Sequence, residues 1–266
     1  MKFFEFGKEN EKTLMILCGY LAKWSPSILP FIDEAKKHYH VIVQAYDGFN
    51  EDEPDTVFES IMLEAGYAAG FIKEKLGGKL DILYGISLGG MVGNELLLIE
   101  GIQVHTFIAD GYTIMPMPTF RFGITERIYV RCYSAMIHSV LTKHQWLLAK
   151  LIGRTEGSVR EALYTDVSRQ SIVNSVKSEI GYRYKFESFN MTDSYIFHGS
   201  AEIKTARKVH KLRKQGINFR HQLFKDTGHA ELIHGDPKRL LSYIDKAYRL
   251  GVKKEKNNGD QRIRQK

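Results

Sequence analysis

A serine with a glycine two residues away on either side is the feature of this sequence best suited to covalent chemistry. Ser87 lies within the run GISLGG, residues 85–90, after the apolar stretch 80–84 and before a segment of helical character, 91–99. A serine on a sharp turn between a strand and a helix needs neighbours without side chains, because the backbone is cramped there. The helix would direct its first N–H groups at an anion forming beside the hydroxyl. The pattern predicts a serine nucleophile.

Strand and helix signals alternate on both sides of this turn, which predicts an α/β fold with mostly parallel strands and right-handed crossovers. Helix signals open at Ser25-Pro26 and at the capping-box pair Thr56 and Glu59, and a closing helix from Asp236-Pro237 is expected to stop at Gly251. Strands are expected at 2–6, antiparallel at the sheet edge, and at 13–17, 40–45, 80–84, 103–109, 194–198 and 219–224.

With this order of elements the chain resembles the α/β-hydrolase superfamily. The resemblance runs from Cys18-Gly19, through the Ser87 turn, to Gly228-His229, and so covers nearly the whole length. It implies the α/β-hydrolase fold, a mostly parallel sheet flanked by helices. It also implies a nucleophile, an acid and a histidine in that order along the chain.

The resemblance assigns the partners of the serine. His229, in the loop after the last strand, would take the Ser87 proton, and Glu202, in the Gly-Ser-Ala-Glu sequence after strand 194–198, would orient the imidazole. Glutamate stands where aspartate is more frequent. A minority of such enzymes place the acid at the end of the preceding strand, so Asp110 is the alternative.

An oxyanion hole is implied by the same resemblance. Gly19 matches the glycine of the family's first loop, so the backbone N–H groups of Tyr20 and Leu88 would stabilise the anion. Cys18 stands where the family usually has histidine, and we expect it to be a buried, inert thiol.

An insertion separates the two parts of the predicted core. Residues 1–111 and 193–251 form the core, and 112–192 form an all-helical cap, with one helix expected over 125–152. Gly111 and Gly123 at its base are candidate hinges. Eight apolar or aromatic residues of the cap could line an acyl pocket: Met115, Met117, Phe120, Phe122, Tyr129, Tyr133, Met136 and Trp146.

Composition excludes several classes of protein. The net charge is +7, but +4 of it lies in the basic segment 252–266, expected to be a disordered tail, so nucleic-acid binding is not indicated. Cys18 and Cys132 cannot form a disulfide framework, and no metal-ligand spacing is present. No signal peptide or membrane span is evident, which favours the cytoplasm. Oligomeric state is not readable from the sequence.

These residues favour a serine hydrolase that needs no cofactor or metal and cleaves a small-molecule ester with a small or medium, largely apolar acyl group. Thioester or carbon–carbon bond hydrolysis uses similar machinery and stays open. A non-catalytic small-ligand receptor on the same fold and a degenerate scaffold for protein partners stay open as well. Dehalogenase or epoxide hydrolase chemistry is less favoured, because those branches normally need an aspartate where Ser87 stands.

Overall fold

The protein is built on one seven-stranded sheet with the order β1-β3-β2-β4-β5-β6-β7. The computed structural model describes residues 1–111, 123–147, 161–182 and 184–264. All neighbouring strands are parallel except β1, which pairs antiparallel with β3 at the edge, as predicted. The strands are β1 (Lys2–Phe6), β2 (Thr13–Leu17), β3 (His40–Ala45), β4 (Lys79–Ile86), β5 (Gln103–Asp110), β6 (Asp193–Gly199) and β7 (Arg220–Phe224).

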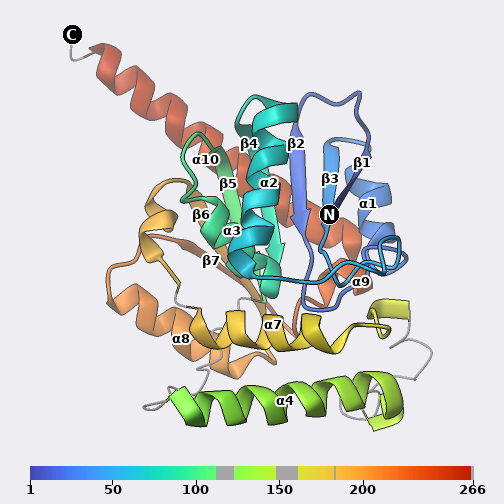
Figure 1. The fold of residues 1–266 in the computed structure, drawn as a ribbon. Coiled ribbons are helices and arrows are strands. Elements are labelled where there is room, and N and C mark those ends of the chain that lie inside the picture. Colours follow the sequence, from blue (N-terminus) through green and yellow to red (C-terminus); the bar gives the residue numbers. More distant parts are fainter. Residues whose placement is uncertain (112–122, 148–160, 183, 265–266) are drawn as a thin grey trace.

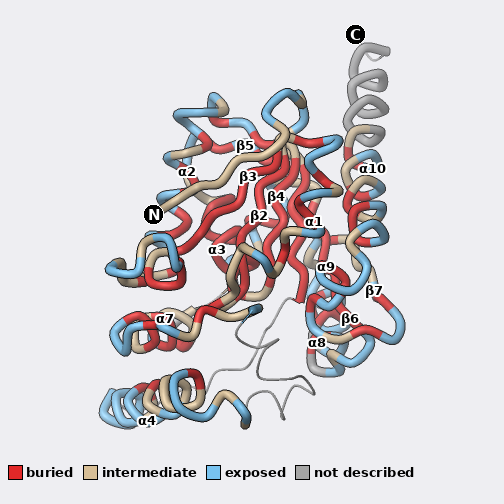
Figure 2. Tube along the Cα trace, turned by 90° about the vertical axis from the view of Figure 1, so that its right-hand side faces the viewer, coloured by how far each residue is buried: buried red, intermediate tan, exposed pale blue. Residues whose placement is uncertain are grey.

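Helices cover both faces of the sheet, so its central strands are buried on both sides (Figure 2). On one face lie α2 (Ile61–Leu76) and α3 (Leu88–Leu96), and on the other lie α1 (Leu29–Ala35) and α10 (Pro237–Arg264) (Figure 1). Three further elements are α8 (Ile203–Lys214), α9 (Leu232–Gly235) and, within the inserted segment, the 3-10 helix η1 (Phe186–Asn190). None of the helices in the described ranges combines the length and apolarity needed to cross a bilayer.

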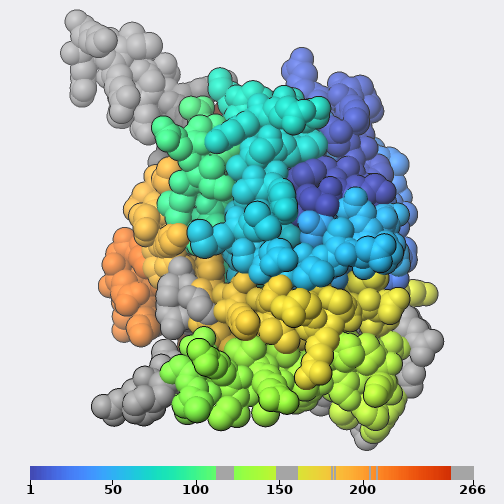
Figure 3. Space-filling view, in the orientation of Figure 1, coloured from blue at the N-terminus to red at the C-terminus, as the bar shows by residue number. Residues whose placement is uncertain are grey.

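Two helices of the inserted segment lie beyond the carboxyl ends of the strands. In Figure 1, α7 (Arg169–Gly181) lies directly under the sheet and α4 (Gly123–Lys143) lies under α7, and Figure 3 shows the same two layers forming the lower end of the molecule. Hydrogen bonds tie α7 to the segment after β3. The Ser171 hydroxyl accepts from the Phe58 N–H at 3.1 Å, and Asn174 donates to the Phe58 carbonyl at 3.0 Å.

The starts of the first two helices differ from the sequence prediction. The first helix begins at Leu29 rather than at Ser25-Pro26. The second begins after Ser60, whose hydroxyl accepts from the Leu63 N–H, so Thr56 is not its cap. Thr56 instead holds the preceding loop, because its hydroxyl accepts from the Gly48 N–H at 2.8 Å.

The helix expected over 125–152 also ends early. The His144 N–H donates to the Ser139 carbonyl five residues back, a wide turn that closes α4 after Lys143. A short helical stretch follows at 145–147, and the rest of the expected helix lies outside the described residues.

The prediction that the last helix ends at Gly251 is wrong. Helix α10 continues through Gly251 to Arg264, so the segment predicted to be a disordered tail is helical as far as the structure describes it. A Cβ on Gly251 would lie 2.6 Å from Cε1 of His105 and 3.2 Å from Oδ2 of Asp193. Glycine at position 251 therefore allows close packing of the helix against the sheet.

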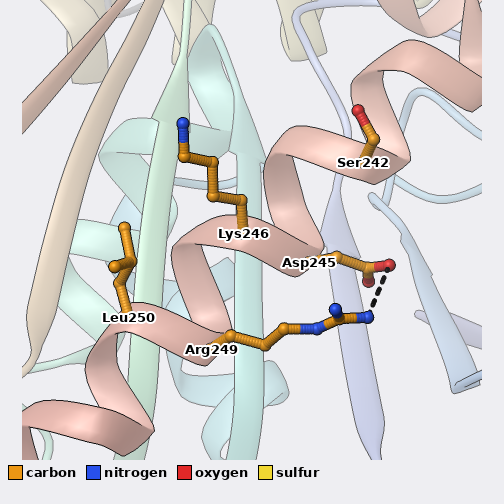
Figure 4. A pocket seen from close by; sticks show the side chains of 5 residues that line it. All are labelled: Ser242, Asp245, Lys246, Arg249 and Leu250. Carbon is orange, nitrogen blue, oxygen red and sulfur yellow. Dashed lines mark ion pairs between the residues drawn. The ribbon is translucent and has the colours of Figure 1, made fainter.

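A shallow pocket lies on α10 itself (Figure 4). It is lined by Ser242, Asp245, Lys246, Arg249 and Leu250. Asp245 and Arg249 form an ion pair across it at 4.0 Å. All of the lining residues belong to one helix, and none of them is a candidate site residue.

The packing at Gly251 predicts opposite effects for two glycine substitutions. Replacing a helical glycine with alanine contributes up to about 1 kcal/mol of helix propensity. In Gly66→Ala, in an exposed part of α2 with open space around it, that gain should raise the free energy of unfolding. In Gly251→Ala, overpacking against His105 costs roughly 1–3 kcal/mol and should lower it. Urea denaturation of both variants tests this, and an equal stabilisation by both would contradict the packing role.

Candidate active site

Ser87 lies on the turn between β4 and α3 with φ 53° and ψ −109°. A positive φ is disfavoured for a residue with a Cβ, so the surrounding packing must hold it. A Cβ on Gly85 would lie 2.5 Å from the Gly89 carbonyl oxygen, and a Cβ on Gly89 would collide with the Leu17 carbonyl oxygen at the end of β2. The close approach of these three backbones presents Ser87 at the carboxyl edge of the sheet, where it is partly accessible to water.

The loop after β2 lies beside Ser87. A Cβ built on Gly19 would be 3.7 Å from the Ser87 Cβ. Leu88 is the first residue of α3, where helical N–H groups have no intrahelical acceptor. Among the described residues, the Tyr20 N–H also has no backbone acceptor. Both predicted oxyanion donors therefore belong to segments adjacent to the serine.

Cys18 in the same loop is buried, and burial raises the pKa of its thiol to about 12. The thiol therefore stays protonated at neutral pH. This agrees with the expectation of a buried, inert thiol at this position.

Glu202 and His229 are in direct contact. His229 Nδ1 lies 2.8 Å from Glu202 Oε1, and the other carboxylate oxygen accepts from the Gly199 N–H at 2.9 Å. The glutamate is thereby fixed at the end of β6. Because Nδ1–H donates to the carboxylate, Nε2 of the neutral imidazole is left as the basic nitrogen.

Backbone contacts join the turn that carries Glu202 to the loop that carries His229. The Ala201 N–H donates to the Thr227 carbonyl at 3.1 Å. A Cβ on Gly199 would collide with the carbonyl oxygens of Thr227 and Gly228, so glycine is required for the two segments to meet. The pairing of acid and histidine is therefore built into the backbone.

Asp110 and Gly111, at the end of β5, connect the serine to the histidine. The Ser87 N–H donates to the Asp110 carbonyl at 2.8 Å. A Cβ on Gly111, which has φ 61°, would lie 2.6 Å from Cε1 of the His229 ring. Ser87 and His229 thus pack against two consecutive residues. Their side chains are not hydrogen-bonded to each other in this structure, and such contacts commonly shorten only when substrate binds.

The Asp110 carboxylate, the alternative acid, has a different partner. It is buried and accepts a hydrogen bond from the Tyr84 hydroxyl. Burial raises its pKa to about 6, although the Tyr84 hydrogen bond opposes the shift. Asp110 acts on His229 through its charge, whereas Glu202 also accepts the hydrogen bond. The structure therefore brings Glu202, and not Asp110, to the imidazole.

The charge balance of the site favours the imidazolium. Burial opposes the charged form of His229, but the hydrogen bond and charge of Glu202, followed by the charge of Asp110, outweigh it and raise the pKa of His229. A cation that formed on this ring during a reaction would therefore be stabilised where it forms.

Comparison with solved structures identifies the architecture. A thermophilic esterase from Thermogutta terrifontis matches with a TM-score of 0.70 at 16% identity, over 94% of this chain and 93% of the other. MenH from S. aureus matches at 0.69 and 15% identity, over 92% and 98% of the two chains. The enol-lactonase from Burkholderia xenovorans matches at 0.62 and 13% identity, over 92% and 94%. The chain has the α/β-hydrolase fold.

The predicted fold class is thus confirmed. Because the sequence identities are low, these likenesses establish the α/β-hydrolase fold and do not establish an activity. No protein-family model matches the sequence, and no curated protein matches it. Within the described ranges, no three His, Cys, Asp or Glu side chains are grouped so that they could hold a metal ion.

Four of the eight residues expected to line an acyl pocket, Met115, Met117, Phe120 and Phe122, lie outside the described residues. Of the others, Met136 and Trp146 are more than half exposed. Tyr129 and Tyr133 stack on each other on α4, with ring centroids 5.3 Å apart.

Sequence reasoning missed two contacts of this α/β-hydrolase site. The sequence predicts Gly111 as a hinge, yet this glycine also leaves room for the His229 ring. The sequence indicates Tyr84 only as part of an apolar strand, yet its hydroxyl donates a hydrogen bond to the Asp110 carboxylate. The Asp-Gly pair after a strand indicates a turn and carries no signal for either contact.

The two acids should have unequal effects on the histidine. Glu202→Gln should lower the pKa of His229 because it removes both the charged acceptor and its negative charge. Asp110→Asn should lower it less, because only a charge is lost. An NMR pH titration of the His229 ring in each variant measures both shifts. A larger fall in Asp110→Asn would make Asp110 the principal partner.

Proposed function

We propose that this protein is a serine hydrolase that cleaves carboxylic esters through an acyl-enzyme intermediate. The observation that carries the proposal is the 2.8 Å contact between His229 Nδ1 and Glu202, at the carboxyl edge where the Ser87 turn projects. A serine hydroxyl needs a base oriented by a third group, and these three residues supply the three roles.

In the proposed reaction, His229 Nε2 takes the proton of Ser87 as its oxygen attacks the ester carbonyl. Glu202 holds the tautomer and stabilises the imidazolium. The N–H groups of Tyr20 and Leu88 stabilise the oxyanion, each contributing about 3 kcal/mol in the transition state. The imidazolium then protonates the leaving alcohol, and water attacks the acyl enzyme by the same sequence of proton transfers.

The proposed substrate is a small-molecule ester with a small or medium, largely apolar acyl group. Two considerations support an ester: the site has the residue types of acyl transfer, and the structural neighbours include an esterase and an enol-lactonase. Helices α7 and α4, which lie beyond the strand ends, are in the position to cover such a substrate (Figure 1).

An activated serine should react with a fluorophosphonate, giving one adduct detectable by intact mass. Ser87→Ala and His229→Ala should both lose it while remaining folded. In an ester-hydrolysis assay, Glu202→Gln should lower kcat more than Asp110→Asn. A labelled Ser87→Ala protein would refute the proposed nucleophile. A collapse of turnover in Asp110→Asn alone would transfer the role of acid to Asp110.

The contact of Gly111 with His229 should matter for turnover. Gly111→Ala places a methyl group 2.6 Å from the imidazole, and a displacement of about 1 Å can cost roughly a hundredfold in kcat. Gly216→Ala is the matched control, because Gly216 also has a positive φ, 76°, but no atom lies within 4 Å of the added Cβ. Both substitutions should lower stability by about 1–2 kcal/mol through backbone strain. Equal turnover in both variants would contradict a positioning role for Gly111.

A further inference from the structure

The positive charge of this protein is gathered on one short stretch of the chain. Residues 203–225 contain eight Lys or Arg residues and no Asp or Glu. Because residues 252–266 add +4 and the whole chain is +7, the rest of the chain carries −5. The basic stretch spans α8 and β7. The body of the protein is therefore acidic, and one side of it is strongly basic.

Helix α8 has a buried face and a basic face. Thr205, Val209 and Leu212 are buried where the helix packs on β6. Residues at helical spacing on the opposite side are all exposed: Ile203, Arg207, His210, Lys211 and Lys214. The helix lies at the outer flank of the molecule, where Figure 3 shows it in orange. We call these five exposed residues the outer face of α8.

Two other cations of the basic stretch are used inside the fold. The Arg213 guanidinium lies over the Phe219 ring, 5.9 Å from its centroid. The Arg220 guanidinium forms an ion pair with Asp193 at 2.9 Å. These contacts explain cations beside the sheet, but they do not explain the charge on the outer face of α8.

The cations of the outer face repel one another. Arg207 and Lys211 are four residues apart, and Lys214 follows three residues later. Like charges at these spacings destabilise a helix, and the basic stretch contains no acid that would relieve the repulsion. An anionic surface lying along the helix would remove it. The charge pattern therefore fits an anionic partner.

Exposed apolar side chains at one end of this face favour a lipid surface over other anions. Ile203 at the start of α8 is 61% exposed, and Leu223 near the end of β7 is 42% exposed. Strands β6 and β7 are paired, and Ile203 directly follows Glu202, so both side chains lie at the edge of the sheet that carries the candidate site. On a bilayer, cations contact the headgroups while apolar side chains enter the interface. A nucleic acid would neutralise the cations and leave the apolar side chains in water.

We propose that the outer face of α8 binds this protein peripherally to the surface of an anionic phospholipid bilayer. Arg207, Lys211 and Lys214 contact the lipid phosphates, and Ile203 enters the interface. The inference does not depend on the proposed hydrolysis. It places the edge of the sheet that carries Ser87 beside the bilayer, where apolar esters are concentrated.

The test is flotation of the full chain with phosphatidylcholine vesicles that contain or lack phosphatidylglycerol. We expect binding to the vesicles with phosphatidylglycerol alone, and we expect added salt to weaken it. The triple variant Arg207→Gln, Lys211→Gln and Lys214→Gln should lower the partition coefficient roughly a hundredfold. Glutamine keeps the helix propensity of these exposed positions, so the variant should remain folded.

Two further variants separate the location of the charge from its amount and the apolar contact from the charge. Lys238→Gln, Arg239→Gln and Lys246→Gln together remove the same charge from exposed positions of α10 and should leave binding nearly unchanged. Ile203→Ser should weaken binding to anionic vesicles severalfold and leave its salt dependence in place. Equal losses in the two triple variants would overturn the role of α8.

Duplex DNA and polyglutamate serve as anions without lipid. Binding to either of them, with no binding to anionic vesicles, would overturn the bilayer and assign the outer face to a nucleic acid or to an acidic protein. Binding to vesicles and to DNA would support the bilayer if Ile203→Ser weakens only vesicle binding, and would overturn it if both are unchanged. Absence of binding to all three probes would overturn the inference outright.

Discussion

The close approach of three backbones around Ser87 is the constraint on which the rest of this structure depends. Strand β4, helix α3 and the end of β2 meet where Gly85 and Gly89 leave no room for a side chain, and Ser87 is held at positive φ between them. Such a conformation persists only when its surroundings over-determine it. The buried parallel sheet provides that rigidity, because β2 and β5 flank β4 on either side.

Adjacent strand ends then assemble the other groups. Strands β4, β5 and β6 end side by side and carry Ser87, Asp110 and the turn to Glu202, while the loop after β7 returns with His229. Two glycines permit the final contacts: Gly199 allows the histidine loop to approach the acid, and Gly111 leaves space for the imidazole. The site thus depends on glycines at these two positions as well as on the reactive side chains.

The inserted helices are bonded to the loops that form the site. Ser175 contacts the hydroxyl of Tyr20, and the Tyr164 N–H donates to the Leu21 carbonyl in the same loop. Tyr182 donates to the Met91 carbonyl on α3. Movement of α7 would therefore be transmitted to the segment that carries a proposed oxyanion donor. The position of α7 is thus coupled to that of the loop that carries Tyr20.

Sequence alone determined the Ser87 turn, the order of the strands along the chain and the antiparallel edge strand. These features follow from steric limits and periodicity, which are written in residues close together in the chain. Only the tertiary structure shows which of Glu202 and Asp110 contacts the imidazole, since both acids lie at the ends of parallel strands on the same edge of the sheet. The two acids differ in their partners. Glu202 accepts a hydrogen bond from His229, 27 positions along the chain, whereas the Asp110 carboxylate accepts one from the Tyr84 hydroxyl.

The errors at helix ends have the same origin. Gly251 has the local character of a helix stop, but its missing side chain accommodates His105 on β5, and the helix continues. Packing between segments that are distant in the chain is set by the whole fold rather than by neighbouring residues.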